Sequence, residues 1–482
     1  MSFVLYPSFT ILLELQSWIQ SRAKALTYIN KNGCWSPQTS QWSKKVAGET
    51  QVCFLYKKKT MQTNTRQTYL DWLRIFSILG VLFFHSAMPY VSWNAWHIKN
   101  QETSDLMMES NYFMHLFRMP LLFFISGTVS FYMMQRRSSW SFIRLRFRRL
   151  FIPVLVGMLL IVPPQVYMER LTQGFKGNFW QFYPKVFEFI PYPKGNFSWH
   201  HLWFIVYLFI YDLLFAPLFA WMASSGSRGF KERLAGLAIG KRIYWLALPG
   251  IIWFALLSDS HPETNDLMHD GVYFIYWLFF LLAGFICIAQ PTLMDSLERN
   301  RRFALTVGFV SLLLLYYMRW NHVEPDYFNN PIGKAYALYT LLSLKGLVAW
   351  GWVLALVGYG KRYLNRRHKV LNYLNQAVYP FYILHQTVIV VLAYYITKAP
   401  NESILSKYIY TVGMTLFVSV GIYHLLIKPF ALTRFLFGMK PKSEGKREGE
   451  DRPEGEEKPQ PQEKQPTEPQ PARIHELLTL SH

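Results

Sequence analysis

The sequence predicts an all-α, polytopic integral membrane protein with about ten transmembrane helices. Of its 482 residues 51% are hydrophobic and only 16% charged, and apolar runs of about 20 residues, the length that crosses a bilayer, recur along the chain. The charge is also uneven, because residues 440–482 hold 18 of the 79 charged side chains. The remainder is too poor in charge for a water-exposed surface, which excludes a soluble multidomain enzyme.

Ten apolar runs give the expected helices in their order along the chain. Inside lipid every backbone amide must be paired within its own segment, so each run is expected to be a helix. The fifth and seventh runs are the shortest. The runs comprise residues 70–90, 112–134, 150–168, 201–223, 243–258, 271–289, 303–318, 335–358, 376–396 and 408–430.

The connecting loops predict the orientation. The loops after the second, fourth, sixth and eighth runs hold 19 Lys and Arg residues, whereas the opposite loops hold 9 over longer segments. Because positive loops stay in the cytoplasm, both termini are expected to be cytoplasmic. The protein is accordingly expected to be a multi-pass protein of the cell (inner) membrane, with the lipid bilayer as a partner.

The two ends of the chain differ from the membrane region. Residues 1–65 form a leader without the basic region and cleavage site of a signal peptide, and Met61 is the expected working start. Residues 66–438 form the membrane domain. Pro, Glu, Gln and Lys dominate residues 439–482, so this cytoplasmic tail is expected to be disordered and to carry no catalytic residue.

Several kinds of site are not expected. The three cysteines Cys34, Cys53 and Cys287 have no paired spacing, which argues against a disulfide framework or a cysteine metal site. No H-x-x-x-H or H-E-x-x-H pair occurs on one helix, so no metal site is predicted. The net charge of +21 comes from clusters between apolar runs, where it sets the topology, and nucleic acid is not an expected partner.

The first run carries the strongest candidates for chemistry, because ionisable side chains inside a span are costly. Arg74 and His85 are 11 residues apart, about three helical turns, so they share one face. Asp71 lies three residues before Arg74 and can pair with it. The competing interpretation is that Asp71 and Arg74 anchor the helix at the interface and that His85 is a structural helix contact.

The second run and the loop after it add further cations. His115 and Arg118 lie in the first turns of the run, where an arginine can also simply reach the interface. Four arginines, among them Arg148 and Arg149, precede Pro153, a good helix start. This loop is either a purely topological signal or a phosphate-binding lip, since guanidinium groups suit phosphate oxygens.

Three later runs carry ionisable groups. His200 and His201 open the fourth run, Lys345 lies in the middle of the eighth, and His385 lies in the ninth. A single histidine in a helix is more often structural than catalytic. Several that converge inside a bilayer favour a functional site, and clustered histidines also suit a metal, the competing use.

These residues stand in strings that resemble the acyltransferase-3 family of integral membrane acyltransferases. Over about residues 66–438 the resemblance is carried, in register, by DWLRIFSILGVLFFHSAMPY, FRMPLLFFISGTVSFYMM, RLRFRRLFIP, HLWFIVYL and AVYPFYILHQTVI. Within the family, WHIKNQE, MHLFRM and RFLFGMKP are most similar to the glucan biosynthesis protein C group, which is associated with succinylation of periplasmic glucans.

The resemblance implies transfer of an acyl group from cytoplasmic acyl-CoA, a co-substrate, to a carbohydrate hydroxyl across the membrane, with no bound cofactor. It assigns Arg74 and His85 to catalysis, with His85 as the base. It assigns Arg148 and Arg149 to the CoA phosphates. Arg74 joins them because its expected position is on the cytoplasmic side, where those phosphates would arrive. The remaining matches, assigned here to substrate binding, are His201 and Trp203 in the HLWF element and His385 in the penultimate helix.

Chemistry leaves several alternatives open. Imidazole suits deprotonation of an acceptor hydroxyl, but an acyl-imidazole intermediate on His85 is equally compatible. The acyl group is succinyl or acetyl; a succinyl carboxylate needs a cation, which Lys345 or Arg118, with His115 beside it, would supply. A transporter or flippase for a sugar or lipid-linked glycan also has about ten helices with buried ionisable residues, although no internal symmetry is found. A structural membrane subunit is the third reading.

Overall fold

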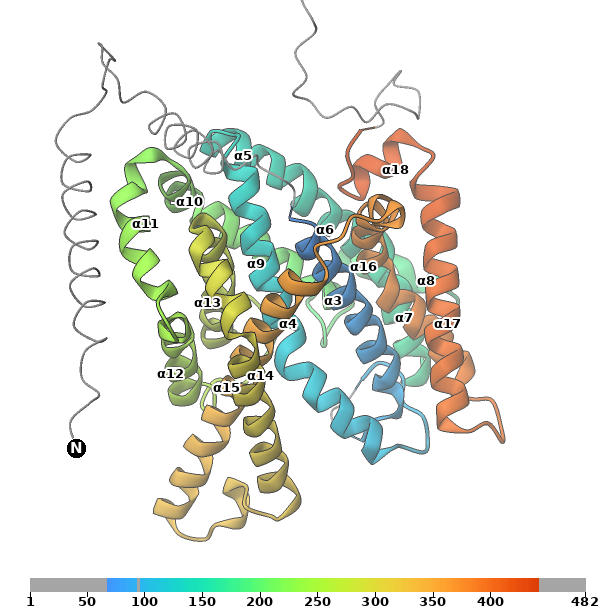
Figure 1. Cartoon of the computed structure of the whole chain (residues 1–482). Coiled ribbons are helices and arrows are strands. Elements are labelled where there is room, and N and C mark those ends of the chain that lie inside the picture. The colour runs from blue at the N-terminus through green and yellow to red at the C-terminus, as the bar shows by residue number, and fades with distance from the viewer. Residues whose placement is uncertain (1–66, 93–95, 442–482) are drawn as a thin grey trace, which may run out of the picture. The chain divides into compact units, whose positions relative to one another are not determined.

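A computed structural model describes residues 67–92 and 96–441. The predictions for the leader, Met61 and the tail beyond residue 441 lie outside these residues. The described residues are helical, without a named β-strand. The helices are α3 (Thr68–Ala87), α4 (Asp105–Met134), α5 (Ser139–Arg146), α6 (Ile152–Val156), α7 (Val162–Thr172), α8 (Phe179–Phe182), α9 (Trp203–Leu214), α10 (Ala216–Ala223), α11 (Arg228–Ala235), α12 (Leu248–Leu257), α13 (Gly271–Ala289), α14 (Pro291–Trp320), α15 (Pro331–Tyr363), α16 (Lys369–Ile396), α17 (Ile404–Ile422) and α18 (Ala431–Leu436) (Figure 1).

Each of the ten apolar runs lies on a helix or a pair of helices. Among the described residues, eight helical segments are long and apolar enough to cross a membrane. The fourth run forms the bent pair α9 and α10, and the fifth lies on the shorter apolar segment Arg242–Leu257. The prediction of a polytopic all-α membrane protein is therefore confirmed, and the orientation of the termini stays a prediction.

The fourth run is bent next to a proline. α9 and α10 meet at an angle of 63° around Phe215. Pro217 stands at the start of α10, where its missing N–H and its ring are tolerated, whereas a continuous helix would place the ring against the carbonyl of Leu213. The first run carries its proline, Pro89, only near its end, and it continues as one helix over Thr68–Ala87 before that point.

Prolines also free backbone carbonyls in the third span, residues 139–172, where two π-helical turns interrupt the α-helix. Pro153 and Pro163 have no N–H to give to the carbonyls four residues before them. Side chains from elsewhere supply the missing donors: Tyr379 Oη donates to the carbonyl of Arg149 (2.9 Å) and Tyr183 Oη to that of Leu159 (3.0 Å). Thr387 Oγ1 donates in addition to the carbonyl of Ile161 (2.6 Å), two residues before Pro163. The span thus depends on neighbouring segments for its backbone hydrogen bonds.

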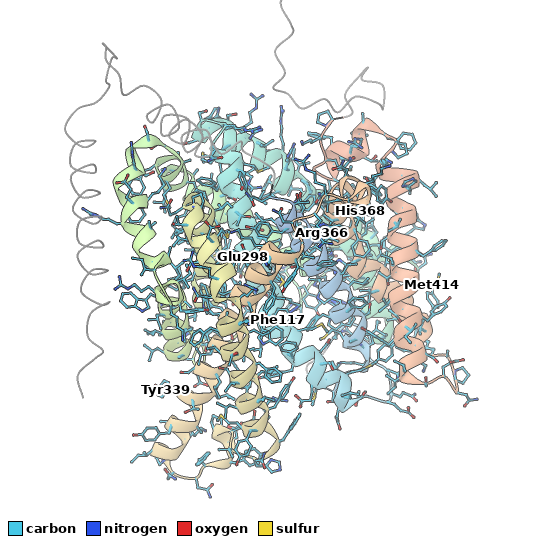
Figure 2. All side chains as sticks on the ribbon, in the orientation of Figure 1. Phe117, Glu298, Tyr339, Arg366, His368 and Met414 are labelled. Carbon is cyan, nitrogen blue, oxygen red and sulfur yellow. The ribbon has the colours of Figure 1, made fainter. Side chains whose placement is uncertain are left out.

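The outward faces of the helices are apolar, as a surface against lipid requires. Side chains project from the whole described part of the chain (Figure 2). On α17 the exposed side chains include Leu405, Ile409 and Phe417, the last with 73% of its surface accessible. In water such a surface would favour aggregation, and in a bilayer it is the stable arrangement.

Helices α4 and α13 approach closely through two glycines. A Cβ atom on Gly127 would lie 1.9 Å from the carbonyl oxygen of Leu281, and one on Gly284 would lie 1.9 Å from that of Phe124. Small residues at a helix crossing let two backbones pack together, which is the main source of helix association in lipid. This contact fixes α4, the helix that carries His115 and Arg118.

We expect Gly127→Ala to destabilise the protein by about 1–3 kcal/mol, because the added methyl group has no space and forces α4 and α13 apart. Thermal unfolding of the protein in detergent measures the change. Gly413→Ala on α17 is the matched control: nothing lies within 4 Å of its added Cβ, so stability should be unchanged or slightly raised. Equal stability of the two variants would contradict the close packing.

The first helix is central to the arrangement of the candidate site. α3 contacts α4, α15, α16 and α17 (Figure 1). Its face toward α16 carries Arg74 at one end and His85 at the other. The two halves of the chain therefore meet along α3, and residues about 300 positions apart in sequence come into contact there.

Candidate active site

Both candidate residues of α3 bind the same helix, α16. Nη2 of Arg74 donates to Oδ1 of Asn375 (2.6 Å), and Nδ1 of His85 lies 3.0 Å from Nε2 of His385. Arg74 also pairs with Asp71 at 3.8 Å. The 11-residue spacing of Arg74 and His85 predicted one shared face, and this geometry agrees with it.

The hydrogen bonds of His385 fix which nitrogen of His85 is free. Nδ1 of His385 lies 2.6 Å from the backbone carbonyl of Tyr382, which can only accept, so Nδ1 carries the proton. In the neutral ring Nε2 of His385 is then an acceptor, and Nδ1–H of His85 donates to it. The two rings are parallel, with centroids 5.2 Å apart. Nε2 of His85 keeps a lone pair and has no hydrogen bond to any residue that the structure describes.

His201 supports this pair from the side. Its ring meets that of His385 edge-on, with centroids 5.2 Å apart, and its Nε2 donates to the carbonyl of Ile383 (2.9 Å). The hydroxyl of Tyr382 donates to the carbonyl of His201. His201 therefore braces the turn of α16 that carries His385.

Trp203, the other residue of the HLWF element, lies in an aromatic cluster. Its ring packs against Tyr207 (5.1 Å), Phe123 (6.0 Å) and Trp277 (6.1 Å). Only 9% of its surface is exposed, and it makes no ring contact with His85 or His385. This position anchors α9 to α4 and α13.

Arg118 lies beside His85. Its guanidinium carbon is 3.5 Å from the centre of the Phe84 ring, and it is within electrostatic range of His85. Nη1 of Arg118 lies 3.4 Å from Nδ1 of His115, while Nε is buried without a hydrogen-bond partner among the described residues. A buried donor of this kind is costly unless a ligand uses it.

A loop between α12 and α13 reaches the same place. Nε2 of His115 lies 3.3 Å from Oε2 of Glu263. Burial alone would raise the pKa of Glu263, but His115 and Arg118 lower it below its ordinary value. The loop is also held by Asp270, which accepts from Tyr207 Oη (2.7 Å) and whose pKa burial raises to about 6. Glu263 was not predicted; as a loop carboxylate it had no distinguishing sequence signal.

Lys345 has different neighbours. It lies on α15, where it interacts electrostatically with Arg319, Glu324 and Asp259. The neighbouring side chains of this face of α15, including Leu341 and Leu344, pack with Tyr112 on α4. The structure therefore brings Arg118, and not Lys345, to His85.

A cavity of about 210 Å³ lies along the part of α3 that carries Arg74. Arg74, Arg146 and Arg149 line it, with apolar side chains of α4, α9 and α16 and with Tyr382, whose carbonyl accepts from His385. Arg148 is exposed and does not line the cavity. The cavity is thus lined both by three arginines and by the turn of α16 whose backbone carbonyl accepts the hydrogen bond of His385.

A buried ion pair, not predicted from the sequence, lies next to this cavity. Nε of Arg146 is 2.6 Å from Oδ2 of Asp212 on α9, and both side chains are at most 5% exposed. Ser130 of α4 joins them, since its Oγ accepts from Arg146 Nη2 (2.6 Å) and donates to Asp212 Oδ1 (2.8 Å). The available signal was Asp212 itself, a carboxylate inside the fourth apolar run.

The histidines of this region raise the question of a metal centre. In residues 67–92 and 96–441 no group of three or more His, Cys, Asp or Glu side chains is placed to hold a metal ion. The histidines near His85 instead bind each other, backbone carbonyls and single carboxylates.

Comparisons with known proteins define the class. A model of the acyltransferase domain of the acyltransferase-3 family matches residues 67–424. The chain belongs to this family and is a multi-pass membrane acyltransferase. This decides against the transporter and the structural subunit as the primary activity.

The individual relatives have low sequence identity to this chain. The chain is 23% identical over 389 residues to glucans biosynthesis protein C of Salmonella heidelberg (strain SL476), covering 78% of this chain and 95% of that protein. It is 24% identical over 394 residues to glucans biosynthesis protein C of Escherichia coli O1:K1, with the same coverage. No solved structure matches the chain significantly.

Proposed function

We propose that the protein moves an acyl group from cytoplasmic acyl-CoA to a hydroxyl of an extracytoplasmic glycan, with His85 as the general base, in the cell's inner membrane. The observation that carries this proposal is the hydrogen-bond chain from His85 through His385 to the carbonyl of Tyr382, which leaves the lone pair on Nε2 of His85 free. The names of the relatives, glucans biosynthesis proteins, favour a glucan as the acceptor.

The proton step follows from this tautomer. Nε2 of His85 takes the proton of the acceptor hydroxyl while its oxygen attacks the thioester carbonyl. The carbon–sulfur bond breaks, and the CoA thiolate takes the proton. His385 keeps the ring of His85 in the tautomer that this step requires, because its own Nδ1–H is committed to a backbone carbonyl.

The cavity is the proposed donor site. Arg74, Arg146 and Arg149 supply cations for the CoA phosphates, and the apolar walls suit the uncharged arm that carries the thioester. Arg148, one residue away, is exposed and does not line the cavity, so its proposed role is contact with a phosphate outside it.

Arg118 supports an anionic acyl group. Its buried Nε has no partner among the described residues and lies near His85, where the free carboxylate of a succinyl group, or the developing oxyanion, would be stabilised. We therefore favour succinyl-CoA over acetyl-CoA as the donor.

The deciding experiment is release of free thiol by the purified protein in nanodiscs, given succinyl-CoA or acetyl-CoA with and without a glucan. We expect acceptor-dependent release, faster with succinyl-CoA. Absence of release from both thioesters by a folded protein would refute the proposal.

Arg149→Gln should raise the KM for acyl-CoA about tenfold while the acceptor KM stays unchanged, because one charged hydrogen bond to phosphate is lost. The same thiol assay, run at varied acyl-CoA, measures it. Lys428→Gln is the control, since Lys428 is a cation of the α17–α18 connection that does not line the cavity. An unchanged donor KM in Arg149→Gln would place the phosphates elsewhere.

A further inference from the structure

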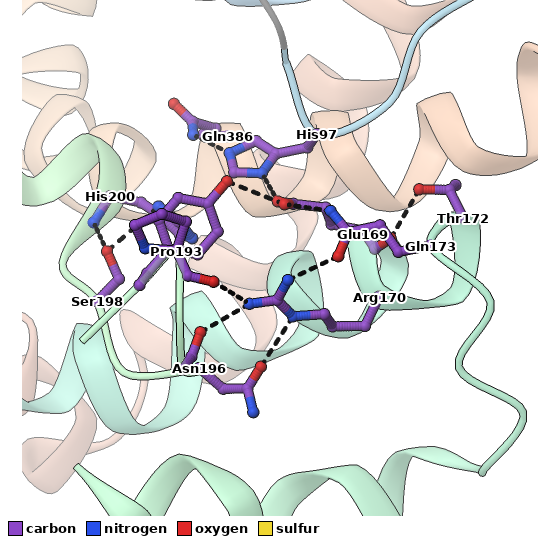
Figure 3. Close-up of polar contacts among 12 residues, drawn as sticks. His97, Glu169, Arg170, Thr172, Gln173, Pro193, Asn196, Ser198, His200 and Gln386 are labelled. Atoms are coloured by element: carbon purple, nitrogen blue, oxygen red, sulfur yellow. Dashed lines mark hydrogen bonds and ion pairs between the residues drawn. The ribbon is translucent and has the colours of Figure 1, made fainter. Parts of the chain in front are cut away.

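The pair formed by His97 and Glu169 lies next to the candidate active site and contacts the residue of α16 that follows His385. Gln386 directly follows His385, and its Nε2 is 3.4 Å from Nε2 of His97. Nδ1 of His97 pairs with the carboxylate of Glu169, at the end of α7 (Figure 3). We call the following residues the His97 cluster: Trp96, His97, Glu169, Tyr192, His200 and Gln386.

The carboxylate of Glu169 is fully occupied by side chains of the protein. Its Oε1 accepts from Tyr192 Oη (2.9 Å) and Gln173 Nε2 (3.1 Å), and its Oε2 faces His97. The carboxylate is 6% exposed, so its acceptor positions are already used. Because a carboxylate accepts, Nδ1 of His97 carries the proton and Nε2 presents a lone pair.

The contact of Nε2 of His97 with Gln386 is weak. At 3.4 Å the bond from Gln386 to His97 is at the long limit for a hydrogen bond. A hydroxyl that donates to Nε2 of His97 and accepts from the amide of Gln386 would satisfy both groups better. A hydroxyl is the neutral group that does both at once.

The surroundings are rigid and aromatic. Arg170 holds the 193–196 turn through bonds to Asn196 Oδ1 (3.0 Å) and to the carbonyls of Pro193 (2.9 Å) and Gly195 (2.7 Å) (Figure 3). The ring of His200 packs edge-on against those of both His97 and Tyr192, each at 4.7 Å. Such a fixed arrangement loses little entropy on binding.

Trp96 connects the cluster to the active site. Its ring lies 6.3 Å from that of His85 and 5.3 Å from that of His97. Polar groups interleaved with aromatic rings suit a sugar, which has hydroxyls at its rim and apolar faces.

We propose that the His97 cluster is a binding subsite for the acceptor carbohydrate, in which Nε2 of His97, oriented by Glu169, accepts a hydrogen bond from one acceptor hydroxyl. Holding that hydroxyl beside Trp96 turns a neighbouring hydroxyl toward His85. The inference rests on the proposed function for the identity of the ligand, and it adds a site that selects which hydroxyl is acylated.

Two substitutions of His97 separate binding from structural support. The amide nitrogen of His97→Asn occupies the position of Nδ1 and keeps the contact with Glu169, but the acceptor at Nε2 is lost. His97→Gln instead places an amide group near the position of Nε2 and gives up the contact with Glu169. A binding role makes the Asn variant the more damaged one, and a purely structural role makes the Gln variant so.

The test measures binding of a soluble linear β-glucan oligosaccharide to the full-length protein in nanodiscs by calorimetry without donor, and then thiol release at varied glucan. We expect His97→Asn to raise the Kd and the acceptor KM about tenfold or more, with the KM for acyl-CoA unchanged. His97→Gln should be affected less. His424→Gln, an exposed histidine on another face, is the control.

The outcomes are distinguishable. Glucan binding that weakens in His97→Asn supports the subsite even if no thiol is released, in which case the transfer proposal alone fails. Wild-type binding by His97→Asn, greater damage in His97→Gln, equal changes in the donor and acceptor KM values, or no glucan binding by the wild type would each overturn the subsite.

Discussion

His85→Ala should lower the rate of acyl transfer by about 100- to 10,000-fold, the contribution of a positioned general base. Acceptor-dependent thiol release under saturating donor measures it. The substitution removes one partly exposed side chain and one hydrogen bond, to His385, so the free energy of unfolding should fall by only about 1 kcal/mol.

The control is His424→Gln, which should retain the wild-type rate. A variant His85→Ala that keeps more than a tenth of the wild-type rate while melting normally would remove His85 from the reaction. In the acyl-imidazole route the loss is at least as large; a stoichiometric burst of thiol without acceptor in the wild type separates that route from direct transfer.

Asp212→Ala should lower the free energy of unfolding by about 3–5 kcal/mol, because it leaves the Arg146 guanidinium buried without its counter-ion. Thermal or denaturant unfolding in detergent measures the loss. This is the largest stability effect that we expect from one substitution in the described residues.

The double variant Arg146→Met, Asp212→Leu is the control for the ion pair. With both charges replaced by apolar groups of similar volume, stability should recover to near the wild-type value. The KM of the double variant for acyl-CoA should nevertheless be higher than that of the wild type, because Arg146 also lines the cavity. A double variant as unstable as Asp212→Ala would show that the pair is not the cause.

The sequence was sufficient for features that depend on one helix. The helical period placed Arg74 and His85 on one face, and the apolar runs located the spans. It could not supply the partners, His385 and Asn375, because contacts across about 300 residues depend on how helices pack. Nε2 of His85 is free because His385 donates to the backbone carbonyl of Tyr382, and no pattern of residue types in the sequence encodes that hydrogen bond.

The basic loop shows a second limit. That Arg148 and Arg149 hold phosphates stays a prediction; of the two only Arg149 lines the cavity, together with Arg146, and Arg148 is exposed. Arg146 and Arg149 are three residues apart and so lie on nearby faces of the helical stretch, whereas Arg148 lies on a different face. Which face of the stretch lines the cavity depends on how α4, α9 and α16 pack around it, and the sequence does not give that packing.

The third span uses hydrogen-bond donors from other segments of the chain, and this has a consequence for biosynthesis. Residues 139–172 emerge from the ribosome long before Tyr379 of α16, whose hydroxyl binds the carbonyl of Arg149 that Pro153 leaves without a backbone donor. Until α16 arrives, this carbonyl would lack a donor, at a cost of several kcal/mol if it faced lipid. The span is therefore expected to wait in the insertion machinery, or beside water, for its partner, so that a truncation before α16 would leave a segment that is made but not stably integrated.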